Sequence, residues 1–254
     1  MEAQLRELVA LGLTGLLCLL RIEAPTFSAA EYDEPAADGR RSNVRLRIEW
    51  YLLGFAMVAA VLVIHPAPAS DLGLGLGNRV GALLGGLGLG AIGTAQAMLF
   101  ARLRYARLRM PPLWSYPGAI LNAIGTAFID EATFRGAVLG LLLLAGIDPA
   151  LAILAQAFLY VLATRTGAPG RSRYAFGLAL FIGLAAGWLT TVTGGIGAAF
   201  LGHAATRIAV FVCTGHAGQP APRGHEVEDS WEFRRPPDGW RQMDRPGEEA
   251  RADR

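Results

Sequence analysis

Apolar residues along the chain are gathered into long runs that polar stretches separate. We place seven runs at about 6–20, 50–64, 80–101, 117–146, 149–164, 174–192 and 195–214. The runs around 80–101 and 174–192 have the length of about 20 residues that a helix needs to cross a bilayer. Helices satisfy their own backbone hydrogen bonds in lipid, and the runs lack the period-two alternation of strands. The pattern predicts an all-α fold, a polytopic integral membrane helical bundle with about seven transmembrane helices.

The polar stretches between the runs differ in their arginine content. Arginines are frequent in 21–49, 102–109, 163–173 and the tail 215–254, whereas the alternate connections contain only Arg79. With seven crossings, the four arginine-rich stretches all fall on one side. Arginine-rich loops stay in the cytoplasm. We therefore expect a multi-pass protein of the cell membrane, with its N-terminus outside and its tail in the cytoplasm.

The composition supports a membrane protein and narrows its partners. Hydrophobic residues make up 53% of the chain and charged residues 17%, against about 25% charged in soluble domains. The net charge is only +2, so we expect the lipid bilayer as a partner and no nucleic acid. We divide the chain into N-terminal membrane helices at 1–115 with a polar loop at 21–49, a core at 116–214, and a disordered cytoplasmic tail at 215–254.

Two further stretches carry weaker signals. The third run is rich in glycine, and small residues four apart let helices approach closely in lipid. Its residues 88–93 also fit G-x-G-x-x-G, but no strand precedes them, so helix packing is the better interpretation than a dinucleotide site. The tail contains Trp231, Phe233 and Trp240 among arginines. A solvated tail is the simpler interpretation, and a docking motif for a cytoplasmic partner is the alternative.

Charged residues occur inside two of the apolar runs. "DEATFRG" contains Asp130, Glu131 and Arg135, and "GHAATR" contains His203 and Arg207. The spacing i, i+4 puts Glu131 beside Arg135 on one helix face, and His203 beside Arg207 on another. Glu131 and His203 each lie roughly 12–22 Å from a segment end, so they can meet inside a bundle. An ionisable residue in a membrane faces a partner or a wet cavity. Either a self-neutralising polar knot or a catalytic or transport site satisfies this requirement.

These two motifs resemble those of a known family. "DEATFRG" is similar to the E-E-x-x-x-R motif of the CAAX-protease and bacteriocin-processing (CPBP) family of intramembrane endopeptidases. The stretch 183–207 resembles that family's closing block, a Gly-Trp helix followed by H-x-x-x-N. The resemblance covers about 116–214. It implies water activation by the first carboxylate and a histidine of an F-x-x-x-H motif, with the last histidine and asparagine as oxyanion donors.

Carried over by position, the resemblance makes Asp130 and Glu131 the acidic pair, Arg135 the motif arginine and His203 the last histidine. Two positions depart from the family. Leu162 follows Phe158 where the F-x-x-x-H histidine belongs, and Arg207 replaces the asparagine. We expect Asp130 or Glu131 as the base, with His203 and Arg207 stabilising the oxyanion.

The same resemblance raises the question of a metal cofactor, which the sequence leaves open. Some accounts of the family invoke a divalent metal such as zinc, for which Glu131 and His203 would be the ligands. The nearby Arg207 would repel a cation, and Asp130 is the only further acid in the motif.

Three functions are compatible with these residues. The first is an intramembrane endopeptidase that cuts membrane-associated peptides or proteins. The second is a catalytically degenerate relative that serves as a membrane scaffold or regulator, because the missing histidine is chemically central. The third is a small transporter whose charged cluster relays protons.

Overall fold

A computed structural model describes residues 2–27, 29, 44–111, 113–164 and 173–216. Most of the tail, from residue 217 onward, and most of the polar loop lie outside the described residues. The predicted disorder of both stretches, and the docking motif around Trp231, are therefore not tested.

Helices form where the apolar runs lie. The main helices are α1 (Glu2–Ile22), α2 (Val44–Ile64), α4 (Arg79–Tyr105), α5 (Pro117–Glu131), α6 (Leu139–Leu144), α7 (Pro149–Ala163), α8 (Arg173–Thr193) and α9 (Gly197–Thr214). A π-helix, η2 (Ala132–Val138), joins α5 to α6, and α3 (Pro68–Asp71) and η1 (Leu113–Ser115) are short. The described residues contain helices and no strands, so the all-α prediction is confirmed for them.

Four helical spans are long and apolar enough to cross a membrane. They are Arg45–Ile64, Arg79–Tyr105, Phe176–Thr193 and Gly197–Thr214. Large apolar side chains on these helices are exposed, including Leu52 at 63% and Val63 at 75%. Exposed apolar surface of this extent suits lipid better than water. The prediction of a membrane protein is therefore supported. The total of seven membrane crossings remains a prediction.

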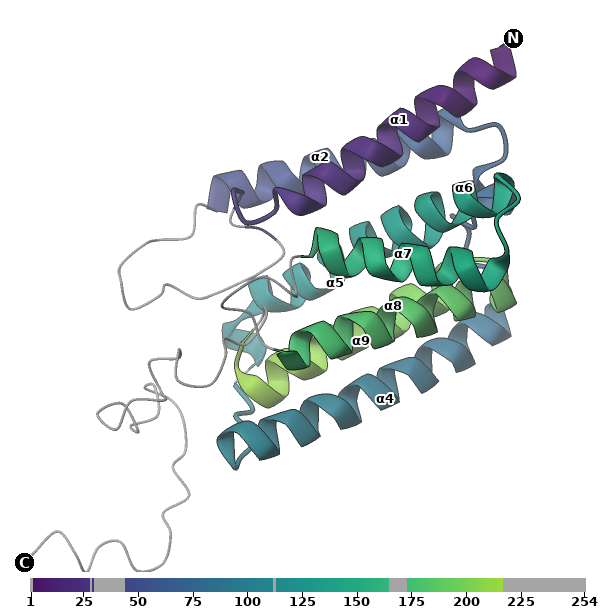
Figure 1. Ribbon diagram of the computed structural model, residues 1–254. Helices are drawn as coiled ribbons and strands as arrows, with labels where there is room; N and C mark the ends of the chain where they lie inside the picture. Colours follow the sequence, from purple (N-terminus) through teal and green to yellow (C-terminus); the bar gives the residue numbers. More distant parts are fainter. Residues whose placement is uncertain (1, 28, 30–43, 112, 165–172, 217–254) are drawn as a thin grey trace, which may run out of the picture.

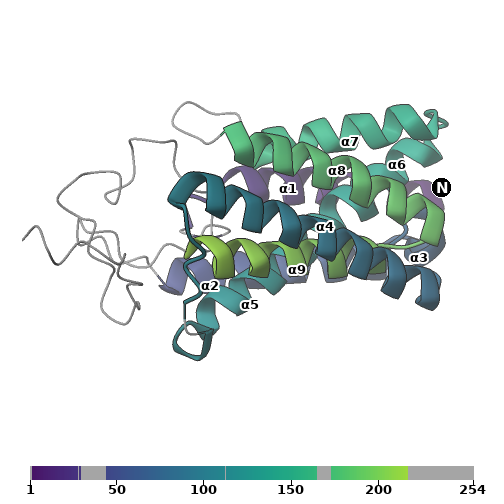
Figure 2. The same ribbon diagram turned by 90° about the horizontal axis from the view of Figure 1, so that it is seen from below.

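The helices pack roughly side by side into one bundle (Figures 1 and 2). In Figure 1, α1 and α2 lie together along one flank and α4 along the opposite flank, with the helices from α5 to α9 between them. Helix α9 packs against α4, α5 and α8, and α7 packs against α8. This arrangement puts α5 and α9, which contain the two charged motifs, in contact near the centre of the bundle.

Local sequence signals determine where the core helices begin and end. Proline occupies the first position of both α5 and α7, where its missing N–H has no cost. The side chain of Asp148 accepts hydrogen bonds from the backbone N–H groups of Ala150 and Leu151, which caps α7. Gly215, with a φ of 74°, ends α9 in the left-handed conformation.

The glycine-rich helix α4 packs closely against α9, as the sequence predicts. A Cβ atom added to Gly93 would lie 1.9 Å from Oγ1 of Thr206, and one added to Gly90 would lie 2.9 Å from Cβ of Ala205. Gly88, on another face, has nothing within 4 Å. The helix-packing interpretation of this run is therefore confirmed.

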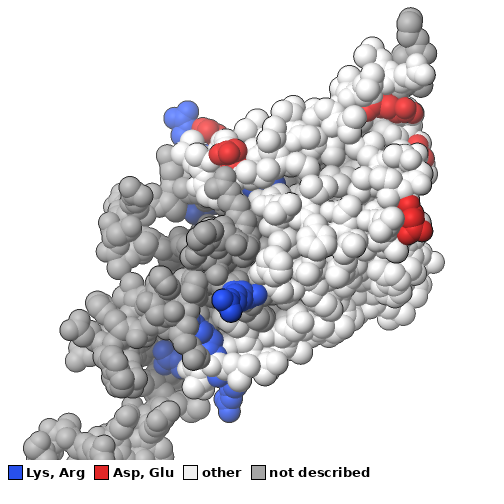
Figure 3. Space-filling view, viewed as in Figure 1, with Lys and Arg blue, Asp and Glu red and all other residues white. Residues whose placement is uncertain are grey.

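Charged side chains lie mainly at the two ends of the bundle. Figure 3 shows the basic side chains gathered at the end where α4 and α9 finish, and a broad uncharged band on the visible face between the ends. This band is where a bilayer would surround the molecule. Which end faces the cytoplasm stays a prediction from the arginine count.

Candidate active site

The acidic pair lies at the junction of α5 and the π-helix, completely buried. Asp130 and Glu131 are both 0% exposed. The Nε–H of Arg21 donates a hydrogen bond to Oδ1 of Asp130 over 2.7 Å. Arg21 belongs to α1 and is itself buried, so the ion pair ties the first helix to the centre of the bundle. A buried carboxylate needs such a counter-charge.

Glu131 makes a separate set of contacts. Its Oε1 lies 2.6 Å from Nδ1 of His203 on α9, and 3.3 Å from Nη1 of Arg135 one turn further along the chain. His203 is 2% exposed and Arg135 is 0% exposed. A carboxylate at Nδ1 fixes the tautomer in which Nδ1 holds the proton and Nε2 offers its lone pair.

A tyrosine on α7 lies on the other side of the imidazole. The Tyr160 hydroxyl is 3.4 Å from Nε2 of His203. The guanidinium carbon of Arg135 lies 4.2 Å from the centre of the Tyr160 ring, and Phe134 packs against the same ring edge-on. Tyr160 is only 4% exposed. Residues from α5, η2, α7 and α9 thus form one continuous cluster, which α1 joins through Asp130.

Helix α7 is where the family pattern expects a second histidine. Leu162, at the expected position, is 69% exposed, and Phe158 is 47% exposed. Both side chains lie on the outer face of the helix. The residue that α7 presents to His203 is Tyr160, which the sequence did not identify as a site residue. Its signal was the spacing i, i+4 and i+8 of Gln156, Tyr160 and Thr164, the polar side chains of this run, which are all buried on one face.

Arg21 was also not identified as a site residue from the sequence. It directly follows the first apolar run, where an arginine reads as a loop residue. Asp130 lies 109 residues away along the chain, so no local spacing could have paired them. Arg207, which we expected near the acidic pair, lies one turn from His203 and is half-buried.

The residues present do not suit a bound metal ion. Among the described residues, no group of three or more His, Cys, Asp and Glu side chains is close enough to hold one. Glu131 and His203 would supply two ligands, but their 2.6 Å contact with each other and the Arg135 cation oppose a divalent ion there.

A polar stripe runs along α5 toward the arginine-rich end. Asn122, Thr126 and Asp130 follow each other at i, i+4 and i+8, and all are buried. The Tyr51 hydroxyl of α2 donates a hydrogen bond to Oδ1 of Asn122 and lies 3.0 Å from Oγ1 of Thr126. Polar groups therefore lead from near the start of α5 to the acidic pair.

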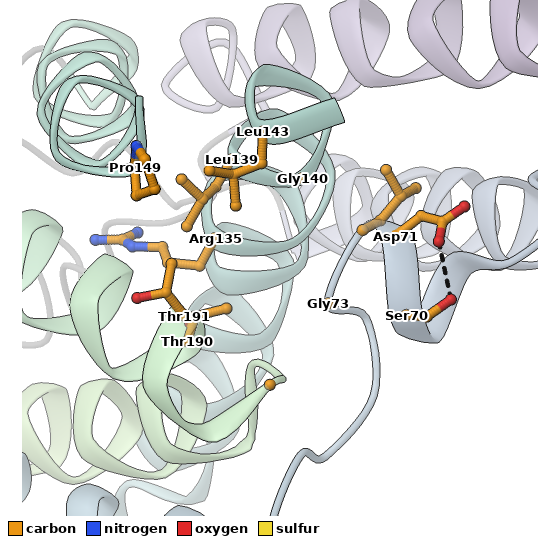
Figure 4. Close-up of a pocket in the computed structure, with 12 residues that line it drawn as sticks. Ser70, Asp71, Gly73, Arg135, Leu139, Gly140, Leu143, Pro149, Thr190 and Thr191 are labelled. Atoms are coloured by element: carbon orange, nitrogen blue, oxygen red, sulfur yellow. Dashed lines mark hydrogen bonds between the residues drawn. The ribbon is translucent and has the colours of Figure 1, made fainter. Parts of the chain in front are cut away.

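A cavity of about 220 Å³ lies on the opposite side of the cluster, toward the end with the shorter connections (Figure 4). Arg135 belongs to its lining, together with residues of α3, α6 and the ends of α7 and α8. In Figure 4, the Arg135 side chain extends away from Asp71 and Gly73, and its guanidinium is buried against Glu131 and the Tyr160 ring. The cavity therefore borders the cluster without opening onto the Arg135 guanidinium, whose nitrogen atoms are buried.

The fold and the site together define a membrane-embedded helical protein with a buried acid–histidine centre. Comparison with protein families gives a match over residues 112–209 to the family described as type II CAAX prenyl endopeptidase Rce1-like. No curated protein and no solved structure matches the chain. This match supports the resemblance of residues 112–209 to the CPBP family of intramembrane endopeptidases that the motifs indicate.

Proposed function

We propose that this protein is an intramembrane endopeptidase that acts on membrane-associated peptides or proteins. The observation that carries the proposal is the 2.6 Å contact between Glu131 and His203, inside the segment that matches the endopeptidase family. A carboxylate and an imidazole in this relation form an acid–base pair suited to activating a nucleophile. Prenylated peptides are the first substrates to test, because the matching family is described by that activity.

The geometry supports a division of labour in which His203 is the base. Glu131 holds the proton on Nδ1 and would stabilise the imidazolium that forms. Nε2 would take a proton from water while the water oxygen bonds to the scissile carbonyl carbon. The same proton would then pass to the leaving amine as the C–N bond breaks. The Tyr160 hydroxyl, beside Nε2, is the donor for the oxyanion in place of the family's asparagine.

In this proposal, Asp130 does not have the catalytic role that its position in the motif suggests. The resemblance makes it the first carboxylate of the pair, but its Oδ1 is bound by Arg21. Glu131 is the acid that contacts the imidazole. We therefore assign the base-supporting role to Glu131, and treat Asp130 as a positioning residue that anchors α1 against α5.

The test is cleavage of a farnesylated peptide by the full chain in liposomes, followed by mass spectrometry of the released fragment. Glu131→Gln and His203→Gln should each lower the rate by about 10²–10⁴-fold, the range for a lost acid–base catalyst. Glu7→Gln, on the exposed start of α1, is the matched control and should leave the rate unchanged. Cleavage that persists in Glu131→Gln would contradict the proposal.

A scaffold or regulatory role is the second candidate, and one observation favours it. The acidic pair and the arginine, histidine and tyrosine side chains that contact it are at most 6% exposed, and each carboxylate has a cationic partner. A charge-balanced knot of this kind can hold four helices together without chemistry. If the folded wild-type protein cuts none of the membrane peptides, and Glu131→Gln only lowers its amount in the membrane, the scaffold role replaces the enzymatic one.

A further inference from the structure

The connection between α4 and α5, residues 106–116, packs against the end of α9. The backbone N–H of Arg109 donates a hydrogen bond to the carbonyl oxygen of Cys213 over 3.0 Å. The next N–H, of Met110, donates to the carbonyl oxygen of Val212 over 2.8 Å. Both carbonyls belong to the last turn of α9, where no further helical N–H is available to bind them. Backbone hydrogen bonds therefore hold the connection at the arginine-rich end of the bundle.

Two residues of this connection have a left-handed backbone, although neither is glycine. The φ angle is 57° at Ala106 and 44° at Met110. Such a conformation persists only where the surrounding structure holds it, and it is frequent at binding sites. The connection also exposes large side chains, with Met110 at 66% and Trp114 at 97%. In membrane proteins an exposed tryptophan is typical of the interface, where its ring lies at the level of the lipid headgroups.

The arginines at this end have no acidic neighbours along the chain. Residues 102–116 contain four arginines and neither Asp nor Glu, and residues 207–216 at the end of α9 also lack both acids. Arg102 and Arg107 are exposed, and with the described residues neither makes an ion pair or a side-chain hydrogen bond. Figure 3 shows the basic side chains gathered at this end of the molecule. The end of α4 and the connection thus combine unneutralised positive charge with an exposed aromatic ring.

We propose that the α4–α5 connection, together with Arg102 at the end of α4, is a binding surface for the headgroups of anionic phospholipids. The guanidinium groups of Arg102 and Arg107 bind phosphate oxygens through charge-assisted hydrogen bonds, and the Trp114 ring lies beside the same headgroups. Each arginine close to an anionic membrane surface strengthens binding about fivefold. Because the connection runs directly into α5, the bound headgroups hold the start of the helix that carries the acidic pair at the membrane surface. The proposal does not rest on peptidase activity.

The test measures the relative binding constant of phosphatidylglycerol over phosphatidylcholine next to Trp114. The full chain is reconstituted in liposomes that contain both lipids, one of which has brominated acyl chains that quench nearby tryptophans. The fluorescence that Trp114 contributes is the difference between the wild-type protein and Trp114→Phe. We expect a preference for phosphatidylglycerol of about fivefold or more at low salt. The preference should fall in about 1 M salt, because exposed charges are then screened.

Variants at the two ends of the bundle separate this surface from a general effect of charge. Arg102→Gln/Arg107→Gln should lower the preference by at least about threefold. Arg6→Gln/Arg79→Gln is the matched control, because it removes two exposed arginines from the starts of α1 and α4 at the opposite end. It should keep the wild-type preference. The proposal is overturned if the wild-type protein does not prefer phosphatidylglycerol, which would leave the surface to another occupant such as the acidic stretches of the tail. It is also overturned if the control variant loses as much preference as Arg102→Gln/Arg107→Gln.

Discussion

The ion pair between Arg21 and Asp130 joins the first helix to the helix that carries the acidic pair. The Nε–Oδ1 distance is 2.7 Å, and the side chains are 6% and 0% exposed. Arg21→Met keeps the apolar stem of the side chain and removes its charge. The buried Asp130 carboxylate would then lose the counter-charge that α1 provides. Its Oδ2 atom already lacks a hydrogen-bond partner among the described residues.

The expected loss of stability follows from this burial. Two unit charges about 4 Å apart attract each other by about 4 kcal/mol at an effective dielectric constant of about 20. Removing one partner of a buried pair typically costs about 3–5 kcal/mol, because the remaining charge is uncompensated. We therefore expect Arg21→Met to lower the free energy of unfolding by about 3–5 kcal/mol.

The assay is reversible unfolding in mixed micelles, with a double-mutant cycle. Asp130→Asn removes the other charge, and the double variant should be more stable than Arg21→Met alone, because no isolated carboxylate remains. Arg45→Met is the matched control. It breaks an exposed arginine–glutamate pair at 3.0 Å and should cost less than about 1 kcal/mol.

Two results would refute this reasoning. One is a loss for Arg21→Met no larger than for Arg45→Met, which would mean that the pair contributes as little as a surface salt bridge. The other is strict additivity of Arg21→Met and Asp130→Asn, since residues that are in direct contact should show coupling.

Three further predictions follow from the site and the packing. Tyr160→Phe removes the hydroxyl at 3.4 Å from Nε2 of His203 and should lower kcat by about 10–10³-fold with little change in KM, as measured on the farnesylated peptide. Gly93→Ala should lower the thermal midpoint, because its Cβ would meet Thr206, whereas Gly88→Ala should not; equal midpoints would contradict the close packing of α4 on α9. Chelators should leave peptide cleavage unchanged, because the described residues offer no three-ligand metal set; loss of activity that zinc restores would disprove this.

Much of the fold could be predicted from hydrophobic pattern alone, since each apolar run becomes a helix. Segment length and composition set these helices, and both are local properties of the sequence. The pairing of Glu131 with Arg135 was also local, because i, i+4 spacing on a helix brings the two together. The contact of Glu131 with His203 could be predicted only from the family motifs and from the similar distance of the two residues from their segment ends.

Other parts of the site could not be read from the sequence. The partner of Asp130 depends on how α1 packs, and Arg21 carries no signal that separates it from loop arginines. The choice of Tyr160 depends on which face of α7 points inward, and the one signal for this face, the i, i+4 and i+8 spacing of Gln156, Tyr160 and Thr164, was not used. The cavity beside Arg135 arises from three connections that meet at one end of the bundle, which only the three-dimensional structure shows.

The π-helix at 132–138 has a consequence for how this region can change over evolutionary time. An α-helix turns about 100° per residue, and a π-helix accommodates surplus residues in a widened turn. Deleting one residue there would restore regular α-helical turns and leave Leu139, a wall of the cavity, facing nearly the same way relative to Glu131. Related chains could thus gain or lose a single residue in this stretch while the cavity wall and the acidic pair keep their relative orientation and both flanking helices stay intact.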